Sequence, residues 1–277
     1  MRVHHLNCGT MCPRGARLLN GEGGLLAPAK MVCHCLLIEA GDGLVLVDTG
    51  FGTEDTRDRW LRRRLSLMGA RLELGETARR QVEELGFESA DVRHIVATHL
   101  DADHSGGLPD FPDAEVHLFA RELEAIAHPK RRHRLGYLGA HWQHGPRWVG
   151  HEVDGDEWFG FGSVRILPGL DAEVLLVPLV GHSHGHTGVA VRIDDGWLLH
   201  CGDAYHHRGD VADPARCPAG LRFFGRLVAA DNGQRVANRE RLRELAAREA
   251  SDVRLVCSHD PHDPAQAQAQ AQAAAAA

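Results

Sequence analysis

The feature that most constrains this chain is a run of four potential metal ligands within six residues, directly after an apolar segment. The ligands are His99, Asp101, Asp103 and His104, and the apolar segment spans residues 91–98. Such a segment is typical of a buried strand, so the ligands begin where the strand ends. Imidazole and carboxylate together suit zinc, iron or manganese. The alternative is a polar loop whose acidic residues cap a following helix.

Three further clusters of histidine or aspartate stand at the ends of apolar runs. A single histidine after a strand is more often a hydrogen-bonded structural residue than a ligand. Because all the clusters share the same position relative to a strand, we expect them to converge on one site. The clusters are His182, His184 and His186 after the run 174–180, Asp203 after the run 196–202, and His259 after the run 252–258.

The chain also contains two similar halves. In the first, a hairpin of runs 33–38 and 44–47 ends at Asp48, helical spacing follows at 54–67 and 77–85, and a strand leads into His99. In the second, a strand ends at Asp203, a helix is expected over 232–249, and a strand leads into His259. These halves predict two sheets covered by helices, with ligands at the strand ends. Chance similarity of two short strands is the alternative.

Composition excludes several classes of protein. The chain has 277 residues, 43% of them hydrophobic, and a formal net charge of −7, so no general basic field favours nucleic acid or membrane lipid. No apolar run is long enough for a signal peptide or a membrane span, which predicts a cytoplasmic protein. The odd number of cysteines, seven, predicts reduced thiols. Oligomeric state is not indicated.

We expect a single domain over residues 1–264, followed by an Ala/Gln tail over 265–277 that is either a frayed helix or disordered. Segments 128–151 and 205–231 show no clear period and are predicted to be insertions that line a site. A zinc knuckle of Cys8, Cys12, Cys33 and Cys35 fits no standard spacing, so small buried thiols are favoured.

Taken in order, these clusters resemble the metallo-β-lactamase superfamily. That family's pattern is a strand ending in Asp, then H-x-[HED]-x-D-H, G-H-[ST]-x-G-H, a bridging Asp and a final His. The corresponding residues here are Asp48, the segments 99–104 and 181–186, Asp203 and His259. The resemblance covers about residues 33–260 and is nearest to the lactonase and glyoxalase II-like members. It implies an α/β fold, a four-layer αββα sandwich of two mixed sheets.

The resemblance implies two adjacent divalent metal ions, with zinc favoured and iron or manganese as alternatives. Asp48 and His186 would orient the ligands by hydrogen bonding. Most hydrolases of the family have His where this chain has Asp101, and the harder carboxylate favours iron or manganese relative to zinc. The implied ligands are His99, Asp101 and His182 for the first ion, Asp103, His104 and His259 for the second, and Asp203 as the bridge.

The implied activity is hydrolysis of a small ester, lactone or related carbonyl substrate by a metal-bridging hydroxide, with no nucleic-acid or membrane partner. Asp103, Asp203 and Tyr205 would be catalytic. Tyr205 lies one residue nearer to Asp203 than the tyrosine of the family's lactonases, and His206 takes that slot. Alternatives are a mononuclear-iron oxidoreductase similar to the sulfur dioxygenases, a phosphodiesterase, and a binding protein with a decayed site. Substrate contacts are expected from His141, Trp142, His184 and His206.

Overall fold

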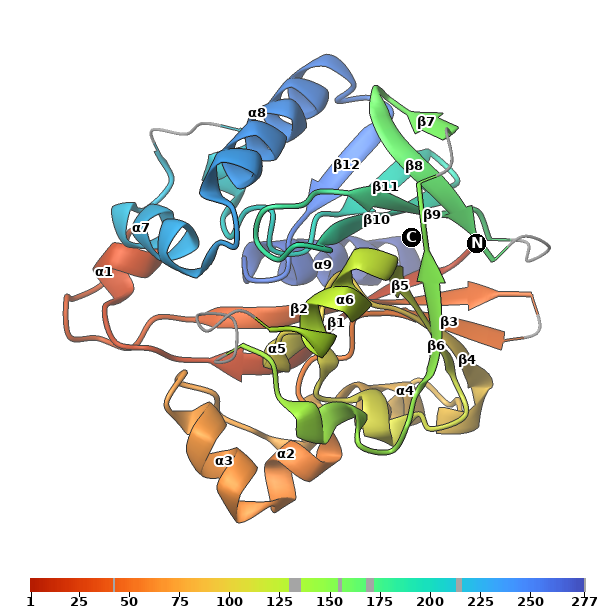
Figure 1. Ribbon diagram of the computed structural model, residues 1–277. Coiled ribbons are helices and arrows are strands. Elements are labelled where there is room, and N and C mark those ends of the chain that lie inside the picture. Colours follow the sequence, from red (N-terminus) through yellow and green to blue (C-terminus); the bar gives the residue numbers. More distant parts are fainter. Residues whose placement is uncertain (42, 130–135, 154–155, 168–171, 213–215, 277) are drawn as a thin grey trace.

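Two mixed β-sheets face each other, each with six strands among the described residues (Figure 1). The computed structural model describes residues 1–41, 43–129, 136–153, 156–167, 172–212 and 216–276. The first sheet has the order β1-β2-β3-β4-β5-β6 and the second β12-β11-β10-β9-β8-β7. The strands are β1 (Val3–Met11), β2 (Met31–Ala40), β3 (Gly43–Val47), β4 (Val92–Val96), β5 (Glu115–Phe119), β6 (Arg147–His151), β7 (Asp156–Trp158), β8 (Phe161–Ile166), β9 (Val174–Pro178), β10 (Thr187–Ile193), β11 (Gly196–His200) and β12 (Val253–Val256).

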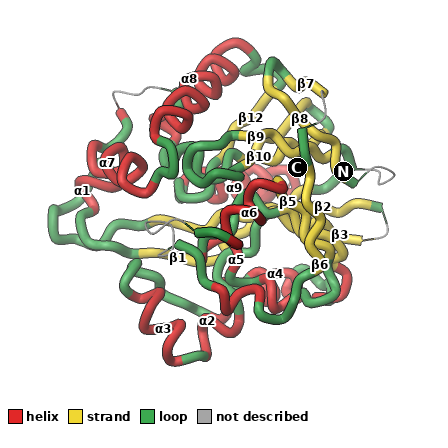
Figure 2. The backbone as a smooth tube through the Cα atoms, in the orientation of Figure 1, coloured by secondary structure: helices red, strands yellow, loops and turns green. Residues whose placement is uncertain are grey.

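Helices cover the outer faces of both sheets (Figure 2). On the outer face of the first sheet, Val82 of α4 packs in one cluster with Leu37 and Leu46. On that of the second, Leu242 of α8 packs in one cluster with Leu199. The helices are α1 (Ala16–Leu19), α2 (Thr53–Arg57), α3 (Arg59–Ser66), α4 (Ala78–Glu84), α5 (Ala102–Ser105), α6 (Ala120–Ala127), α7 (Ala219–Val228), α8 (Asn232–Arg248) and α9 (His262–Ala276).

The core between the sheets follows from the alternation of side chains along each strand. Leu36 and Ile38 of β2 and Val47 of β3 point inward and pack with Val174 and Leu176 of β9. Their chain neighbours point to the opposite face, as the period of two requires. Both faces of the central strands are apolar because both are covered. The layers therefore run helix, sheet, sheet, helix, as expected from the sequence.

The two halves share one local topology. In the first, β2 pairs antiparallel with β3, which pairs parallel with β4. In the second, β10 pairs antiparallel with β11, which pairs parallel with β12. Because β3 and β4 run in the same direction, their carboxyl ends lie at one edge, and so do those of β11 and β12. The residues that follow these strands are thereby brought to a common edge of the sandwich.

Several local expectations need correction. The helix expected over 54–67 is broken at Asp58, whose side chain accepts hydrogen bonds from the backbone N–H groups of Trp60 and Leu61 and begins α3. Segment 128–151 is not simply an insertion, because it contributes β6, which pairs parallel with β5. Segment 205–231 contains α7. Residues 130–135 and 213–215 of these two segments lie outside the described residues.

The tail expected after residue 264 continues a helix, α9, whose Gln268 Nε2 donates to the carbonyl of His5 in β1. All seven cysteines are free thiols. Cys8, Cys33 and Cys35 are buried in apolar clusters, which agrees with the thiols favoured above. Among the described residues, none of the helices has the length and apolar character needed to cross a membrane.

Candidate metal centre

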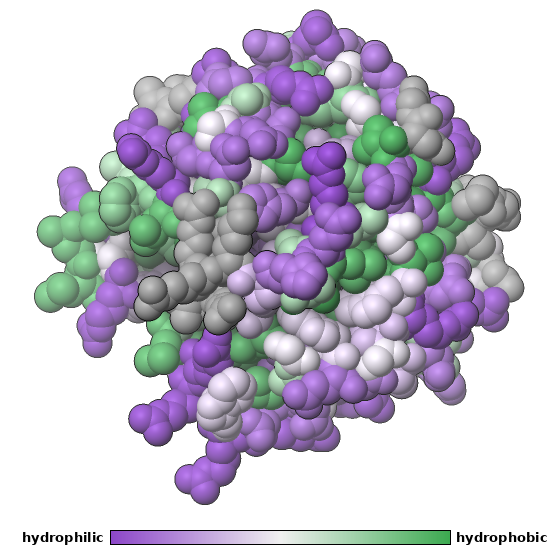
Figure 3. Space-filling view, viewed as in Figure 1, coloured by the Kyte–Doolittle hydropathy of each residue, from purple (hydrophilic) through white to green (hydrophobic). Residues whose placement is uncertain are grey.

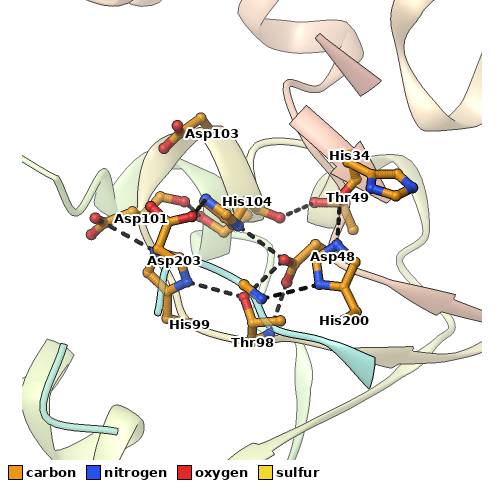
Figure 4. Close-up of polar contacts among 12 residues, drawn as sticks. His34, Asp48, Thr49, Thr98, His99, Asp101, Asp103, His104, His200 and Asp203 are labelled. Atoms are coloured by element: carbon orange, nitrogen blue, oxygen red, sulfur yellow. Dashed lines mark hydrogen bonds and ion pairs between the residues drawn. The ribbon is translucent and has the colours of Figure 1, made fainter. Parts of the chain in front are cut away.

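The predicted ligands meet at the shared edge of the two sheets. Five of them, His99, Asp101, Asp103, His104 and Asp203, are labelled in Figure 4. Asp48 follows β3, the segment 99–104 follows β4 and enters α5, and Asp203 follows β11. His182 lies in the loop between β9 and β10, and His259 follows β12. The predicted ligands, from His99 to His259, span 160 positions and converge because their strands end at the same edge.

Three of the side chains form a first group of ligand atoms. Asp101 Oδ2 lies 3.6 Å from His99 Nε2 and 3.2 Å from His182 Nε2. His182 Nε2 also lies 3.6 Å from Asp203 Oδ2. Asp101 therefore points toward the two imidazoles, and its carboxylate is in position to act as a ligand.

A second group lies on the other side of Asp203. His259 Nε2 is 3.5 Å from Asp103 Oδ2 and 3.2 Å from Asp203 Oδ2. His104 Nε2 is 3.4 Å from Asp203 Oδ1. The Asp203 carboxylate thus stands between the two groups, with ligand atoms of both within 3.6 Å.

These residues fit divalent cations. Within the part of the chain that the structure describes, His99 Nε2, His104 Nε2 and Asp203 Oδ1 are buried and have no hydrogen-bond partner. Buried polar atoms without partners are costly, and convergent ones indicate a site for an ion. Two ligand atoms bound to one tetrahedral ion at about 2.1 Å lie about 3.4 Å apart, close to the separations observed here.

Asp48 holds the imidazoles of the first motif in the orientation that metal binding requires. Its Oδ2 accepts from His104 Nδ1 at 2.9 Å and from Thr98 Oγ1 at 2.8 Å. The Thr98 hydroxyl oxygen lies 3.0 Å from His99 Nδ1. With Nδ1 of each ring engaged in this way, the Nε2 lone pairs face the centre.

The backbone of Asp48 is in the left-handed region, with φ of 54°. Aspartate tolerates this conformation better than most residues, and such strain is often found at functional sites. Burial disfavours the charged carboxylate, but the charge and hydrogen bond of His104 outweigh it and lower the pKa of Asp48. Asp48 therefore remains an acceptor for both side chains.

His186 positions Asp203 through the Asp203 backbone. Its Nδ1 donates to the Leu179 carbonyl at 3.0 Å, and its Nε2 accepts from the Asp203 N–H at 2.8 Å. Burial lowers the pKa of His186 well below the ordinary value, so its ring is neutral. Gly202 has φ of 53°, and a Cβ there would lie 2.5 Å from His186 Nε2. Glycine is therefore required for His186 to reach Asp203.

Glu122, a fully buried residue of α6, also belongs to the site, although no sequence pattern indicated it. Oε1 accepts from the Leu100 N–H and the Tyr137 hydroxyl, both at 3.0 Å. Oε2 accepts from Ser183 Oγ at 2.6 Å and the Gly185 N–H at 3.1 Å. One carboxylate therefore ties the loop that carries His99 and Asp101 to the loop that carries His182.

The catalytic role expected for Tyr205 is wrong. Its side chain is buried in the outer cluster of the second sheet together with Cys201 and Cys257. His206, the next residue, faces the centre instead. Its Nε2 lies 3.4 Å from Asp203 Oδ2, and its ring stacks on that of His259 with 5.6 Å between centroids.

The substrate contacts expected from His141 and Trp142 also need correction. His141 is buried and lies between Asp55 Oδ1, at 2.9 Å from its Nε2, and Ser105 Oγ, at 3.4 Å from its Nδ1. It therefore supports α5. Trp142 packs against the outer cluster of the first sheet. His184 is half-buried in the turn between His182 and His186, and its contact with a substrate stays a prediction.

Comparison with known proteins identifies the family. The model of the metallo-β-lactamase superfamily matches residues 29–259. The chain belongs to this superfamily. A protein named a probable metallo-hydrolase from Mycobacterium tuberculosis is 45% identical over 264 residues, which is 94% of this chain and 81% of the relative.

Two lactonases are also similar. The N-acyl homoserine lactonase AttM of Azorhizobium caulinodans is 30% identical over 186 residues, covering 65% of this chain and 63% of that protein. A crystal structure of AiiA from B. thuringiensis with N-decanoyl-L-homoserine at the active site has a TM-score of 0.71 at 20% identity, covering 95% of both chains. Membership of this superfamily, together with the similarity to a probable metallo-hydrolase, shows that this chain is a metal-dependent hydrolase.

We predict that metal affinity rises with pH. Burial disfavours the charged form of His104, but the carboxylates of Asp203, Asp48 and Asp103 outweigh it and raise the pKa to about 10. Without a metal, this imidazole holds a proton at neutral pH, and a bound ion must displace that proton. Zn²⁺ titration against a competing chelator should give a lower Kd at pH 8 than at pH 6, with proton release. Equal affinity and no proton release would contradict this.

We predict that Glu122→Gln weakens metal binding without unfolding the protein. One oxygen of Glu122 would become an amide that cannot accept from its two donors, so the loops that carry the ligands lose their connection. Metal affinity should fall by about 10- to 100-fold, as for other groups that orient ligands. The control is Glu124→Gln, which changes an exposed residue of the same helix. Equal affinities of the two variants would overturn this role for Glu122.

Proposed function

We propose that this hydrolase opens a small carboxylic ester or lactone with two divalent metal ions, zinc being favoured and iron or manganese the alternatives. The observation that carries the proposal is the position of Asp203. Its Oδ1 faces His104, and its Oδ2 faces His182 and His259. A carboxylate placed between two groups of ligands is suited to hold two ions side by side.

The chemistry divides between the ions and the side chains. When bound, the ions supply a water molecule of lowered pKa and polarise a substrate carbonyl. In this proposal Asp103 accepts the proton of the attacking water and donates it to the leaving alcohol oxygen. His99, His104 and Asp203 are buried, so bulk water is excluded from their side of the centre.

His206 is suited to bind the substrate carbonyl. Burial outweighs the carboxylate of Asp203 and lowers the pKa of His206, which leaves the ring neutral with one N–H. Within the described chain its Nε2 is buried without a hydrogen-bond partner. In our proposal this neutral ring beside Asp203 donates its N–H to the substrate carbonyl oxygen and stabilises the negative charge that develops there.

An exposed apolar surface next to His206 favours a substrate with a hydrocarbon portion. The Phe224 ring of α7 meets the His206 ring edge-on, with 5.7 Å between centroids. Large apolar side chains are exposed on α7, on α1 and in the loop after α1, and they form a hydrophobic area at the left of Figure 3. They are Leu18, Leu25, Leu26, Phe223 and Leu227. The lactonase relatives, named for N-acyl homoserine lactones, support the same substrate class.

We predict hydrolysis of N-acyl homoserine lactones, with preference for longer acyl chains. The experiment is a panel of lactones of increasing chain length, thioesters and phosphodiesters, assayed with zinc-, manganese- and iron-loaded enzyme. kcat/KM should rise with chain length because the apolar surface binds the chain. If the iron-loaded enzyme consumes oxygen and hydrolyses none of these substrates, the protein is an iron-dependent oxidoreductase and the proposal is overturned. Hydrolysis of phosphodiesters but of no lactone would overturn it as well.

We predict that His206→Phe lowers kcat by about 10²- to 10³-fold while metal content stays unchanged, as for loss of one donor to an oxyanion. Phenylalanine keeps the ring that packs on His259 and Phe224 but removes the N–H. Kinetics on one lactone and metal analysis of the same samples test this. If the His206→Phe variant loses metal, His206 is a metal ligand instead. An unchanged kcat would exclude a role for His206 at the substrate carbonyl.

A further inference from the structure

A second group of metal-ligating side chains lies on the first sheet, away from the candidate centre. His94 of β4 is the register partner of Glu115 of β5, and His117 lies two residues further along β5. Because side chains alternate along a strand, Glu115 and His117 share one face. His94 shares the face of Val96, which packs in the core between the sheets. Two imidazoles and one carboxylate are therefore brought side by side by two parallel strands.

We propose that His94, Glu115 and His117 bind a single divalent transition-metal ion, zinc in the first instance, with water completing its coordination. The three ligand atoms are His94 Nδ1, His117 Nε2 and Glu115 Oε2, and all lie within 4.8 Å of one another. The ion would join β4 to β5 and act structurally. The proposal does not depend on the substrate or on the metal content of the hydrolytic centre.

The separations between these atoms are those of ligands around one ion. His94 Nδ1 lies 3.1 Å from His117 Nε2, and Glu115 Oε2 lies 3.8 Å from the first and 3.9 Å from the second. Ligands bound at about 2.1 Å in a tetrahedron are about 3.4 Å apart. Glu115 is too far for hydrogen bonds to either ring but close enough to share an ion with both.

Neighbouring residues orient His117 and Glu115 so that each can direct one ligand atom toward an ion. His117 Nδ1 lies 3.0 Å from His151 Nε2 of β6, so His117 can donate from Nδ1 and present its Nε2 lone pair to an ion. Arg147 Nη2 donates to Glu115 Oε1 at 2.7 Å, which leaves Oε2 directed toward the imidazoles.

This group is distinct from the hydrolytic centre. His94 lies near the start of β4, whereas the ligands of the hydrolytic centre begin only after this strand ends at Val96. The alternative is a chain of hydrogen bonds from His94 through His117 to His151 without an ion. Such a series of hydrogen bonds accounts for the three imidazoles. It gives no role to Glu115 Oε2, which faces His94 and His117.

The test compares Zn²⁺ content. The holoenzyme is dialysed against Zn²⁺ and analysed for bound metal, beside His94→Gln and Glu115→Gln. Each variant should bind one Zn²⁺ per chain fewer than the parent, while the hydrolysis rate stays within about twofold because the hydrolytic centre is untouched. Glu115→Gln keeps the shape of a half-exposed side chain, so it tests the proposal even if His94→Gln fails to fold.

The control is His4→Gln, which removes an imidazole paired with the single carboxylate of Glu39 at 2.8 Å. It should bind as much Zn²⁺ as the parent. Equal Zn²⁺ content in the parent and in Glu115→Gln would overturn the proposal. Loss of zinc together with loss of activity would also overturn it, because the missing ion would then belong to the hydrolytic centre.

Discussion

The burial of three carboxylates at one edge of the sandwich is the constraint on which the rest of the site depends. Asp48, Asp103 and Asp203 are 1%, 7% and 4% exposed. Buried carboxylates are very unfavourable unless positive charge and hydrogen bonds compensate them. The imidazoles around them compensate in one of two ways, by holding protons or by holding metal ions beside the carboxylates. A strong requirement for cations is therefore built into the fold.

Strand direction and a few buried contacts supply the geometry. Parallel pairing of β3 with β4 and of β11 with β12 brings four strand ends together. Asp48 then orients two imidazoles, His186 positions Asp203, and Glu122 joins the two ligand loops. None of these three side chains needs to touch a metal. Asp48, His186 and Glu122 hold the loops so that the ligand atoms lie at distances from one another that suit a shared ion.

The two-sheet sandwich and the clusters at the strand ends could be predicted from the sequence, because apolar runs that end in His or Asp and the order of these motifs are both visible in the sequence itself. Glu122 was missed because a single glutamate in a short amphipathic helix carries no pattern, and its role arises only from tertiary contacts. β6 was missed because its segment, RWVGH, lacks clear alternation.

The choice between Tyr205 and His206 also could not be made from spacing alone. After β11 the chain turns at Gly202, whose φ is 53°. The conformation after that turn decides which of two successive side chains faces Asp203. In the structure, the side chain of Tyr205 lies in the apolar cluster and the side chain of His206 faces the centre.

Anomalous diffraction from crystals of the metal-loaded protein tests the central claim most directly. The account predicts two ions about 3.5–4 Å apart, with Asp203 between them. One should be bound by His99, Asp101 and His182. The other should be bound by Asp103, His104 and His259. A single ion in this region, or Asp203 in contact with neither ion, would contradict it.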